Sequence, residues 1–293
     1  MKILVMGSTN LDYNYRLDHI VRPKETIAAK EFEIHAGGKG LNQSIALAKT
    51  GEHVYLAAAI GNNAQMLVDT LKKYNVDTRY LRELDMPNGH AIIEVDEHGE
   101  NAIIIVGGSN RCFTEEYVES VFADFKEGDF LVLQNEINNL KYIIDRAYEK
   151  KMVILMNPSP CDESLRELPL HKLSYIFINE VEGEFLTGES QPKAILDKLQ
   201  EIYPDTNVIL TLGANGAFYQ SKGVREFAPS RKINAIDTVG AGDTFSGYFT
   251  YGLSKGLSPK QCLEIATKAA SITCTRYGAA ASIPSLEEVN ALD

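Results

Sequence analysis

The stretch DTVGAGDTFSG, residues 237–247 of a 293-residue chain, decides the fold. Gly240 and Gly242 bracket Ala241, Asp243 follows at once, and apolar residues then recur at helical spacing. The pattern predicts a tight glycine turn that leads into a helix. Backbone N–H groups there lack internal partners, so the turn is a candidate anion site beside a carboxylate. Phosphoryl transfer needs both features, because negative charge must be held while a hydroxyl gives up its proton.

In isolation the stretch is more typical of a plain glycine turn followed by an ordinary helix cap. It does not match the GxGxxG fingerprint of dinucleotide-binding proteins, because the next glycine after Gly242 is Gly247. Only other features of the chain can therefore decide between a structural and a functional role.

The composition is that of an acidic globular protein with a substantial core. Hydrophobic residues make up 44% of the chain and charged residues 24%, and the net charge is −11. This balance argues against a nucleic-acid partner, although a local cradle can still bind a small anion. The four cysteines lack the spacing of a zinc site or a redox pair, which predicts reduced, packing thiols. Without a signal peptide or a long apolar run, we expect a cytoplasmic protein with no membrane partner.

Short apolar runs alternate with helical segments along most of the chain, which predicts a mostly parallel sheet covered on both faces. The runs span residues 2–6, 130–133, 153–156, 175–178 and 207–212. Polar residues repeatedly follow these runs, at the strand ends where open α/β sheets build their sites. This recurrence is the main residue-level argument for an enzyme.

Two segments, residues 13–36 and 91–106, lack the helical period. The sequence DEHG at 96–99 predicts a hairpin turn in the second segment. Together the segments predict a small β-sheet inserted into one domain that spans residues 1–293. Such an appendage often serves as a lid over a cleft.

Two stretches near the N-terminus combine polar residues with a strand end or with glycines. Asn10 and Asp12 follow the first strand, and their side chains can bind adjacent hydroxyls in one cleft, although a plain Asx turn is locally the commoner reading. The glycines of GGKG at 37–40 allow close backbone approach, and Asn42 lies in the first turn of the helix that follows. In isolation this second pattern is a helix entry.

Taken in order, five segments resemble the motifs of the ribokinase-like family of sugar kinases, also called the phosphofructokinase-B family. They are GSTNLD at 7–12, GGKGLNQ at 37–43, NEVEGEFLTG at 179–188, TLGANGAF at 211–218 and DTVGAGDTFSG at 237–247. The resemblance covers almost the whole chain. It implies a three-layer α/β/α core with a mostly parallel sheet and a small β-sheet lid.

The resemblance also implies an activity, the ATP-dependent transfer of a phosphoryl group to a sugar hydroxyl. Within the family, the motifs favour D-ribose, which would become D-ribose 5-phosphate. The alternatives are another sugar or a nucleoside as acceptor and, from a different class, a non-catalytic sugar-binding protein on the same fold. A homodimer joined through the lid is implied as well, since such lids pair between subunits in this family.

The resemblance assigns roles to individual residues. Asp243 would be the catalytic base, and Gly240, Ala241 and Gly242 would form the anion hole. The sugar would be bound by Asn10, Asp12, Gly38, Lys39, Asn42 and Glu136. ATP would be contacted by Asn179, Thr211, Gly213, Gly216 and Thr267, with Glu182 acting through Mg²⁺. The ligands of a monovalent cation, K⁺, would come from Asp237, Val239, Thr273, Arg276, Gly278 and Ser282.

Three features depart from the family pattern. Lys24 stands where a glycine is usual, and GNNAQML at 61–67 lacks the usual acidic pair. Thr267 replaces a residue that often contacts the adenine. These departures concern the preferred sugar and base, whereas the fold and the reaction type rest on the five motifs.

Overall fold

The computed structural model describes residues 1–98 and 100–292. Within these residues the larger sheet has nine strands in the order β13-β12-β11-β10-β9-β8-β1-β4-β5. Its strands are β1 (Ile3–Met6), β4 (Val54–Asn62), β5 (Asp77–Pro87), β8 (Phe130–Gln134), β9 (Val153–Asn157), β10 (Tyr175–Asn179), β11 (Asn207–Thr211), β12 (Ala217–Ser221) and β13 (Val224–Ala228). Neighbours from β5 to β11 run parallel, and β12 and β13 pair antiparallel at one edge.

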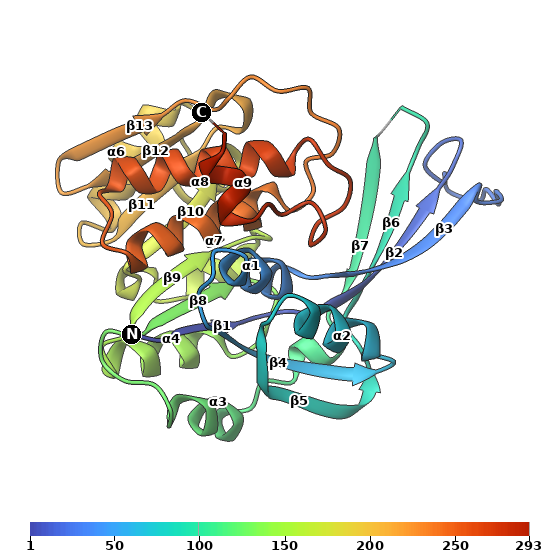
Figure 1. The fold of residues 1–293 in the computed structure, drawn as a ribbon, viewed down its shortest axis with the longest axis horizontal. Coiled ribbons are helices and arrows are strands. Elements are labelled where there is room, and N and C mark those ends of the chain that lie inside the picture. The colour runs from blue at the N-terminus through green and yellow to red at the C-terminus, as the bar shows by residue number, and fades with distance from the viewer. Residues whose placement is uncertain (99, 293) are drawn as a thin grey trace.

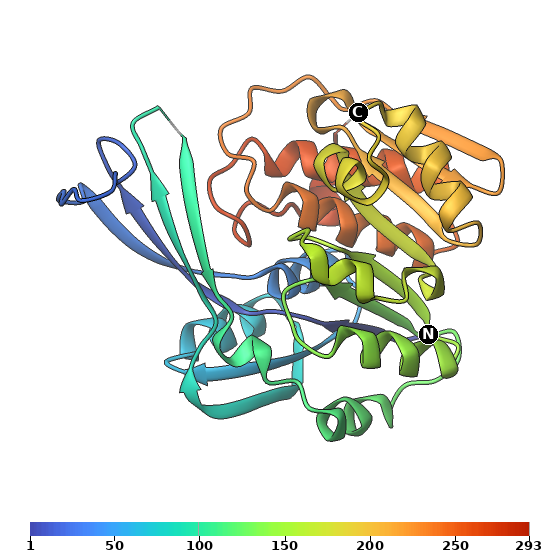
Figure 2. The same cartoon turned by 180° about the vertical axis from the view of Figure 1, so that it is seen from behind.

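Helices cover both faces of this sheet (Figures 1 and 2). One face carries α1 (Lys39–Ala48), α2 (Gln65–Lys73), α7 (Ala241–Ser254), α8 (Pro259–Thr273) and α9 (Leu286–Asn290). The other carries α3 (Glu115–Phe122), α4 (Leu140–Glu149), α5 (Glu180–Thr187) and α6 (Pro192–Ile202). Four short 3₁₀ turns complete the described elements: η1 (Gly108–Arg111), η2 (Glu163–Glu167), η3 (Leu170–Lys172) and η4 (Gly213–Asn215).

The central strands explain why the sequence folds in three layers. β1 and β8 are buried at every position, so each is apolar on both faces rather than on alternate residues. In β1, Ile3 and Val5 pack against the α1, α7 and α8 side, while Leu4 and Met6 pack against the α3 and α4 side. The predicted α/β fold with a mostly parallel sheet is confirmed.

A second, four-stranded sheet projects from one side of the core (Figures 1 and 2). Its order is β3-β2-β6-β7, formed by β2 (Asn10–Arg16), β3 (Glu31–Gly37), β6 (His90–Val95) and β7 (Asn101–Val106). β2 and β6 are parallel, and the two outer pairs are antiparallel. We call this sheet the lid sheet.

The lid sheet contains the two predicted β segments with one correction. Asn10 and Asp12 were expected in a loop after the first strand, but both lie on β2, because the chain passes from β1 into the lid within three residues. Within the first segment, residues 17–30 form no strand. In the predicted hairpin turn, the N–H of Asp96 donates to the Glu100 carbonyl at 3.0 Å. Gly99 of that turn, like the C-terminal residue 293 of the predicted domain, lies outside the described residues.

All four cysteines are free thiols, and Cys262 is buried. In the described part of the chain, every helix is either too short or too polar to span a bilayer.

Candidate active site

A cavity of about 220 Å³ lies where the C-terminal ends of β9, β10 and β11 meet the N-termini of α1 and α7. The position agrees with the rule that parallel sheets build sites at these strand ends. Seven of the predicted site residues line it: Lys39, Asn179, Glu182, Thr211, Gly240, Gly242 and Asp243. The structure therefore gathers residues that are up to 204 positions apart along the sequence, counted from Lys39 to Asp243.

Asp243 is buried in the first turn of α7. Its Oδ2 accepts a hydrogen bond from Asn42 Nδ2, and its Oδ1 accepts one from Gln43 Nε2, both at 3.0 Å. Amide donors to both oxygens favour the ionised carboxylate over the neutral acid. Asp243 is thus prepared to accept a proton.

The predicted glycine turn before α7 is present, and it is left-handed at Gly240. Gly240 is the N-cap with φ +76°, a value that favours glycine. At Gly242 a Cβ would meet no other atom within 4 Å, so this side of the helix start is open. Unpaired N–H groups at an open helix N-terminus can bind an anion such as a phosphate.

Asp12 and Glu136 extend the site toward the lid sheet. Burial, together with the negative charges of Glu136 and Asp243, raises the pKa of Asp12 to about 7. Glu136 Oε2 accepts hydrogen bonds from the Ser8 hydroxyl and from the backbone N–H of Lys39. Gly37 makes room for Asp12, because a Cβ there would lie 1.9 Å from its Oδ2. Three carboxylates thus gather close together, which suits a ligand with several hydroxyl donors.

Asn10 is held by a residue that follows β7, the last strand of the lid sheet in the sequence. Asn110 of η1 donates from Nδ2 to Asn10 Oδ1 at 2.7 Å and accepts the Thr9 N–H at 3.0 Å. Gly38 approaches the same strand closely: a Cβ there would lie 2.9 Å from the backbone nitrogen of Asn10. These contacts fix the start of β2 at the site.

Lys39 has two functions in the geometry. Its backbone N–H donates to Glu136 at 3.1 Å on the hydroxyl-binding side, but its side chain lines the cavity with Asn179 and Glu182. Burial alone would lower the pKa of Lys39, yet the carboxylates of Asp243, Glu136 and Glu182 outweigh it and raise that pKa overall. The ammonium group therefore stays charged among these carboxylates.

Asn179 and Glu182 form a capping box at the start of α5. Asn179 Oδ1 accepts the Glu182 N–H and Glu182 Oε2 accepts the Asn179 N–H, each at 2.9 Å. Burial raises the pKa of Glu182, although the Asn179 hydrogen bond and the Lys39 charge oppose this. The same pair thus builds the helix start and presents polar groups to the cavity.

The remaining predicted nucleotide residues are not brought together. Thr211 lines the cavity, whereas Gly213, Gly216 and Thr267 do not. Gly216 has φ +111°, and a Cβ there would lie 2.2 Å from the carbonyl oxygen of Ala228, so its local role is to pack against β13. The hydroxyl of Thr267 donates to carbonyls within α8, at 2.8 Å to Leu263.

The predicted cation residues lie on two adjoining loops. Asp237 Oδ1 accepts the Val239 N–H and Oδ2 accepts the Gly278 N–H, each at 2.9 Å. The loop before α7 is further tied to the end of α8 by Ile236 N–H, which donates to Cys274 at 2.8 Å. Hard cations prefer oxygen ligands, and the Asp237 carboxylate and the backbone carbonyls of these loops are groups of that type, so the donor chemistry fits K⁺.

The other cation residues surround this junction. Thr273 shares a hydroxyl–hydroxyl hydrogen bond of 3.0 Å with Thr244 of α7, and Ser282 donates to the Ala279 carbonyl at 2.7 Å. The Arg276 side chain pairs with Glu288. It contains no oxygen, so only the backbone carbonyl of Arg276 could act as an oxygen ligand. Both loops adjoin the N-terminus of α7, where Asp243 lies.

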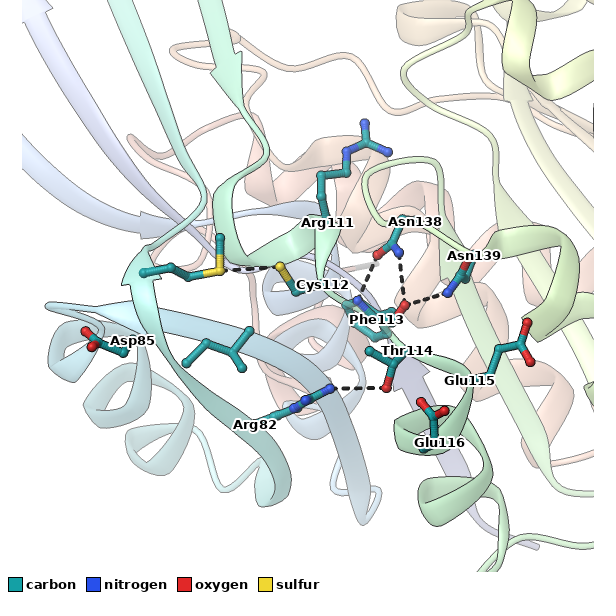
Figure 3. Close-up of a pocket in the computed structure, with 12 residues that line it drawn as sticks. Arg82, Asp85, Arg111, Cys112, Phe113, Thr114, Glu115, Glu116, Asn138 and Asn139 are labelled. Carbon is teal, nitrogen blue, oxygen red and sulfur yellow. Dashed lines mark hydrogen bonds between the residues drawn. The ribbon is translucent and has the colours of Figure 1, made fainter.

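A larger cavity, of about 660 Å³, is separate from this site (Figure 3). It is lined by β5, η1, the start of α3 and the residues before α4. Asn138 and Asn139 engage the backbone of Phe113, and Arg82 donates to Thr114 at 3.3 Å. No predicted site residue is among its described lining residues, so cavity size alone does not identify the active site.

The sequence patterns missed four buried polar residues at the active site: Ser8, Gln43, Asn110 and Gln134. Gln43 and Ser8 both lie within quoted motif segments, and Gln134 directly follows the predicted apolar run 130–133. Ser8 and Asn110 lie in glycine loops, where a polar residue is common and gives no distinct signal.

The comparison with known proteins agrees with this geometry. The family model of pfkB family carbohydrate kinases matches residues 1–286. The ribokinase of Staphylococcus aureus is 33% identical over 99% of this chain and 98% of its own, and the deoxyribokinase of Salmonella typhi is 29% identical over the same shares. A structure of Arabidopsis thaliana ribokinase complexed with ribose and ATP superposes with a TM-score of 0.88 at 26% identity, over 99% of this chain and 98% of that chain.

The family match spans nearly the whole chain, and it agrees with the buried aspartate, the open glycine turn and the cluster of three carboxylates at the site. The chain therefore belongs to the pfkB family of carbohydrate kinases, enzymes that transfer a phosphoryl group to a sugar hydroxyl.

Proposed function

We propose that this kinase phosphorylates D-ribose at its 5-hydroxyl, with ATP as the donor and Asp243 as the base. The observation that carries the proposal is the position of Asp243, which lies between two sets of groups. On one side its charge acts on Asp12, beside Glu136. On the other side it lines the cavity with Lys39 and Glu182. A hydroxyl and a phosphate bound on these two sides would meet at its carboxylate.

The proposed reaction balances with these groups alone. Asp243 takes the proton of the acceptor hydroxyl as that oxygen forms a bond to the γ-phosphorus of ATP. The bond between the γ-phosphorus and the bridging oxygen breaks, and ADP leaves with the negative charge. The N–H groups of Gly240 and Gly242 and the Lys39 ammonium would stabilise the charge that develops on the transferred group. The N–H of Ala241, the third residue assigned to the anion hole, donates to the Thr238 carbonyl at 3.2 Å.

Mg²⁺ and K⁺ belong to the proposal as well. Mg²⁺, when bound, neutralises charge on the phosphates, and Glu182 is the cavity carboxylate that would hold it. Burial raises the pKa of Glu182, and the Asn179 hydrogen bond and the Lys39 charge oppose this rise. K⁺ would be held by Asp237 and by the oxygens of Val239, Thr273, Arg276, Gly278 and Ser282. The nucleotide would be contacted by Asn179, Thr211, Gly213 and Gly216, and Thr267 would lie near its adenine.

Ribose is favoured over other acceptors by the sequence motifs and by the names of the related enzymes. One relative is a deoxyribokinase, so 2-deoxyribose is the second candidate. The presence of both Asp243 and the anion-binding turn favours catalysis over simple sugar binding. The deciding experiment measures kcat/KM for ribose, 2-deoxyribose, fructose, adenosine and pseudouridine with ATP, with and without potassium. The highest value is expected for ribose, and a higher value for any other acceptor would replace it.

We also propose that the lid sheet closes over the sugar and that it joins two copies of the chain into a homodimer. In this proposal the chain is a single domain and the protein is cytoplasmic. The support is the apolar surface of the lid sheet. Six large apolar side chains are exposed on it: Phe32, Ile34, Ile103, Ile104, Ile105 and Val106. Sedimentation of the wild type and of Ile104→Lys tests this: a dimer that the variant dissociates is expected, and a wild-type monomer would exclude it.

A further inference from the structure

Two glutamines outside the predicted site are connected to the carboxylate of Asp243. Gln43, next to Asn42 on α1, donates from Nε2 to Asp243 Oδ1 at 3.0 Å. Gln134, the last residue of β8, donates from Nε2 to Gln43 Oε1 at 2.8 Å. Both glutamines are almost completely buried. Neither is among the described residues that line the 220 Å³ cavity, so they act on the site through Asp243.

Gln134 determines which end of the Gln43 amide faces the carboxylate. A primary amide has a donor end and an acceptor end, and only the NH₂ end can hydrogen-bond an ionised carboxylate. If the Gln43 amide turned over, its oxygen would face Asp243 and its NH₂ would face the NH₂ of Gln134. Both contacts would then be unfavourable, so Gln134 fixes Gln43 in the donating orientation.

The position of Gln134 is itself fixed by the packing of β1 against β8. A Cβ on Gly7 would lie only 2.0 Å from Gln134 Oε1. The absence of a side chain at Gly7 therefore provides the space that the Gln134 amide occupies. Gln134 Oε1 is buried and has no hydrogen-bond partner among the described residues, so the side chain is held by packing and by the bond from its own Nε2.

Asn42, which donates to the other oxygen of Asp243, is different. Its Oδ1 is buried without a partner among the described residues, and the sequence motif assigns this side chain to the sugar. A bound hydroxyl that donates to Asn42 Oδ1 would satisfy this atom. The Asp243 Oδ2–Asn42 side thus faces the acceptor, whereas the Oδ1–Gln43 side faces the protein interior.

We propose that Gln43, held by Gln134, is a positioning residue that anchors Asp243 through Oδ1 and leaves Oδ2 as the oxygen that receives the acceptor's proton. The inference rests on the proposed role of Asp243 as the base. The charged groups around Asp243 come from several elements. Asp12 from β2, Glu136 after β8 and Glu182 from α5 bring negative charge, and Lys39 from α1 is the opposing positive charge.

The test replaces each amide by a side chain of similar shape without hydrogen-bonding groups. In Gln43→Met, Asp243 loses one donor, so kcat should fall about 10- to 100-fold, the usual effect of a hydrogen bond to a charged group. The KM values for sugar and ATP should change little. The acid limb of the kcat/KM profile should move up by roughly one pH unit, because a lost donor to the ionised form raises the pKa.

Gln134→Met should produce the same changes to a smaller extent, and the double variant should resemble Gln43→Met alone. If the two losses in kcat multiplied in the double variant, Gln134 would act independently of Gln43, and the proposal that Gln134 acts through Gln43 would be overturned. A Gln43→Met enzyme with a normal pH profile and kcat would overturn the anchor. If Gln43→Met does not fold, as judged by its thermal transition, Gln134→Met carries the same test.

The matched control is Gln65→Met on α2. Gln65 Nε2 also donates to an aspartate, Asp69, at 2.8 Å, but this pair lies on the exposed surface. No change in kcat or pH profile is expected. A separate readout does not depend on turnover: ¹³C NMR titration of the Asp243 carboxyl, assigned with Asp243→Asn, should show a higher pKa in Gln43→Met. This readout stays valid if no acceptor is phosphorylated, which would refute the proposed function only.

Discussion

The Asp237 carboxylate accepts the N–H of Gly278 at 2.9 Å, across 41 positions of sequence. Its other oxygen accepts the Val239 N–H at the same distance. One side chain therefore holds the loop before α7 against the loop after α8. Since α7 begins at Ala241, this contact determines where the open helix N-terminus lies.

Replacing Asp237 is expected to separate potassium activation from catalysis. Asp237→Ala should lose most of the difference in kcat/KM between KCl and choline chloride buffers, because both the cation ligand and the loop contact are removed. The control is Asp205→Ala, since Asp205 is exposed and pairs only with Lys222. If Asp237→Ala kept the wild-type potassium response, the cation would not bind at these loops.

Lys39 is expected to act on the phosphates more than on the sugar. In Lys39→Met the cavity loses its ammonium group, so kcat should fall and KM for ATP should rise about 10-fold or more, as for a charge-assisted contact. KM for the sugar should stay within about 3-fold, because the backbone N–H that reaches Glu136 remains. Lys193→Met on the exposed face of α6 is the control. A rise in sugar KM alone would assign the side chain to the sugar.

Sugar binding is expected to depend on pH through Asp12, whose pKa is raised to about 7 by burial and by its neighbouring carboxylates. Ionised Asp12 can accept hydrogen bonds from sugar hydroxyls through both oxygens, so the sugar KM should fall as pH rises from 6 to 8. Folding has the opposite sign: the raised pKa favours the protonated form in the folded state, so this group destabilises the fold as pH rises.

The variant Asp12→Asn checks both effects. It should remove the dependence of the sugar KM on pH, and it should raise the melting temperature more at pH 8 than at pH 5. Asp69→Asn, at an exposed position of α2, should alter neither quantity. A wild-type pH dependence in Asp12→Asn would assign the titration to another group.

Asp243→Asn keeps the shape of the side chain and removes the base. We expect kcat to fall about 10²- to 10⁴-fold, the usual contribution of a general base. Calorimetry with sugar and ADP should show binding close to that of the wild type, which separates catalysis from affinity. Turnover near the wild-type value would refute the proposed mechanism.

The fold was predictable where burial on both faces leaves a continuous apolar run. β1 and β8 are such strands, and their predicted positions agree with the structure to within two residues. β5 was not predicted, because it lies at the edge of the sheet and carries charged residues between half-buried ones. β12 and β13 were missed for a similar reason, since their antiparallel pairing leaves residues such as Phe227 partly exposed.

At the site, glycine patterns were the informative signal. Gly38 and Gly240 both have left-handed φ values, and both positions are visible in the sequence as part of short glycine-rich motifs. The partners of Asp243 were less visible. In the sequence, the buried Gln43 cannot be told from an exposed helical glutamine such as Gln65. Only the structure shows that α1 directs Gln43 toward Asp243 of α7.

The lid sheet begins at two of the residues that we propose bind the sugar. Asn10 and Asp12 lie on the first residues of β2, and Asn10 pairs in register with Gly37 at the inner end of β3. If the lid sheet turns about its base as it closes, both side chains would move with it, and sugar binding would then be coupled to the lid angle. A fluorophore on the distal end of β3, at Glu31, would then titrate the acceptor directly and would serve as a sensor that needs neither ATP nor turnover.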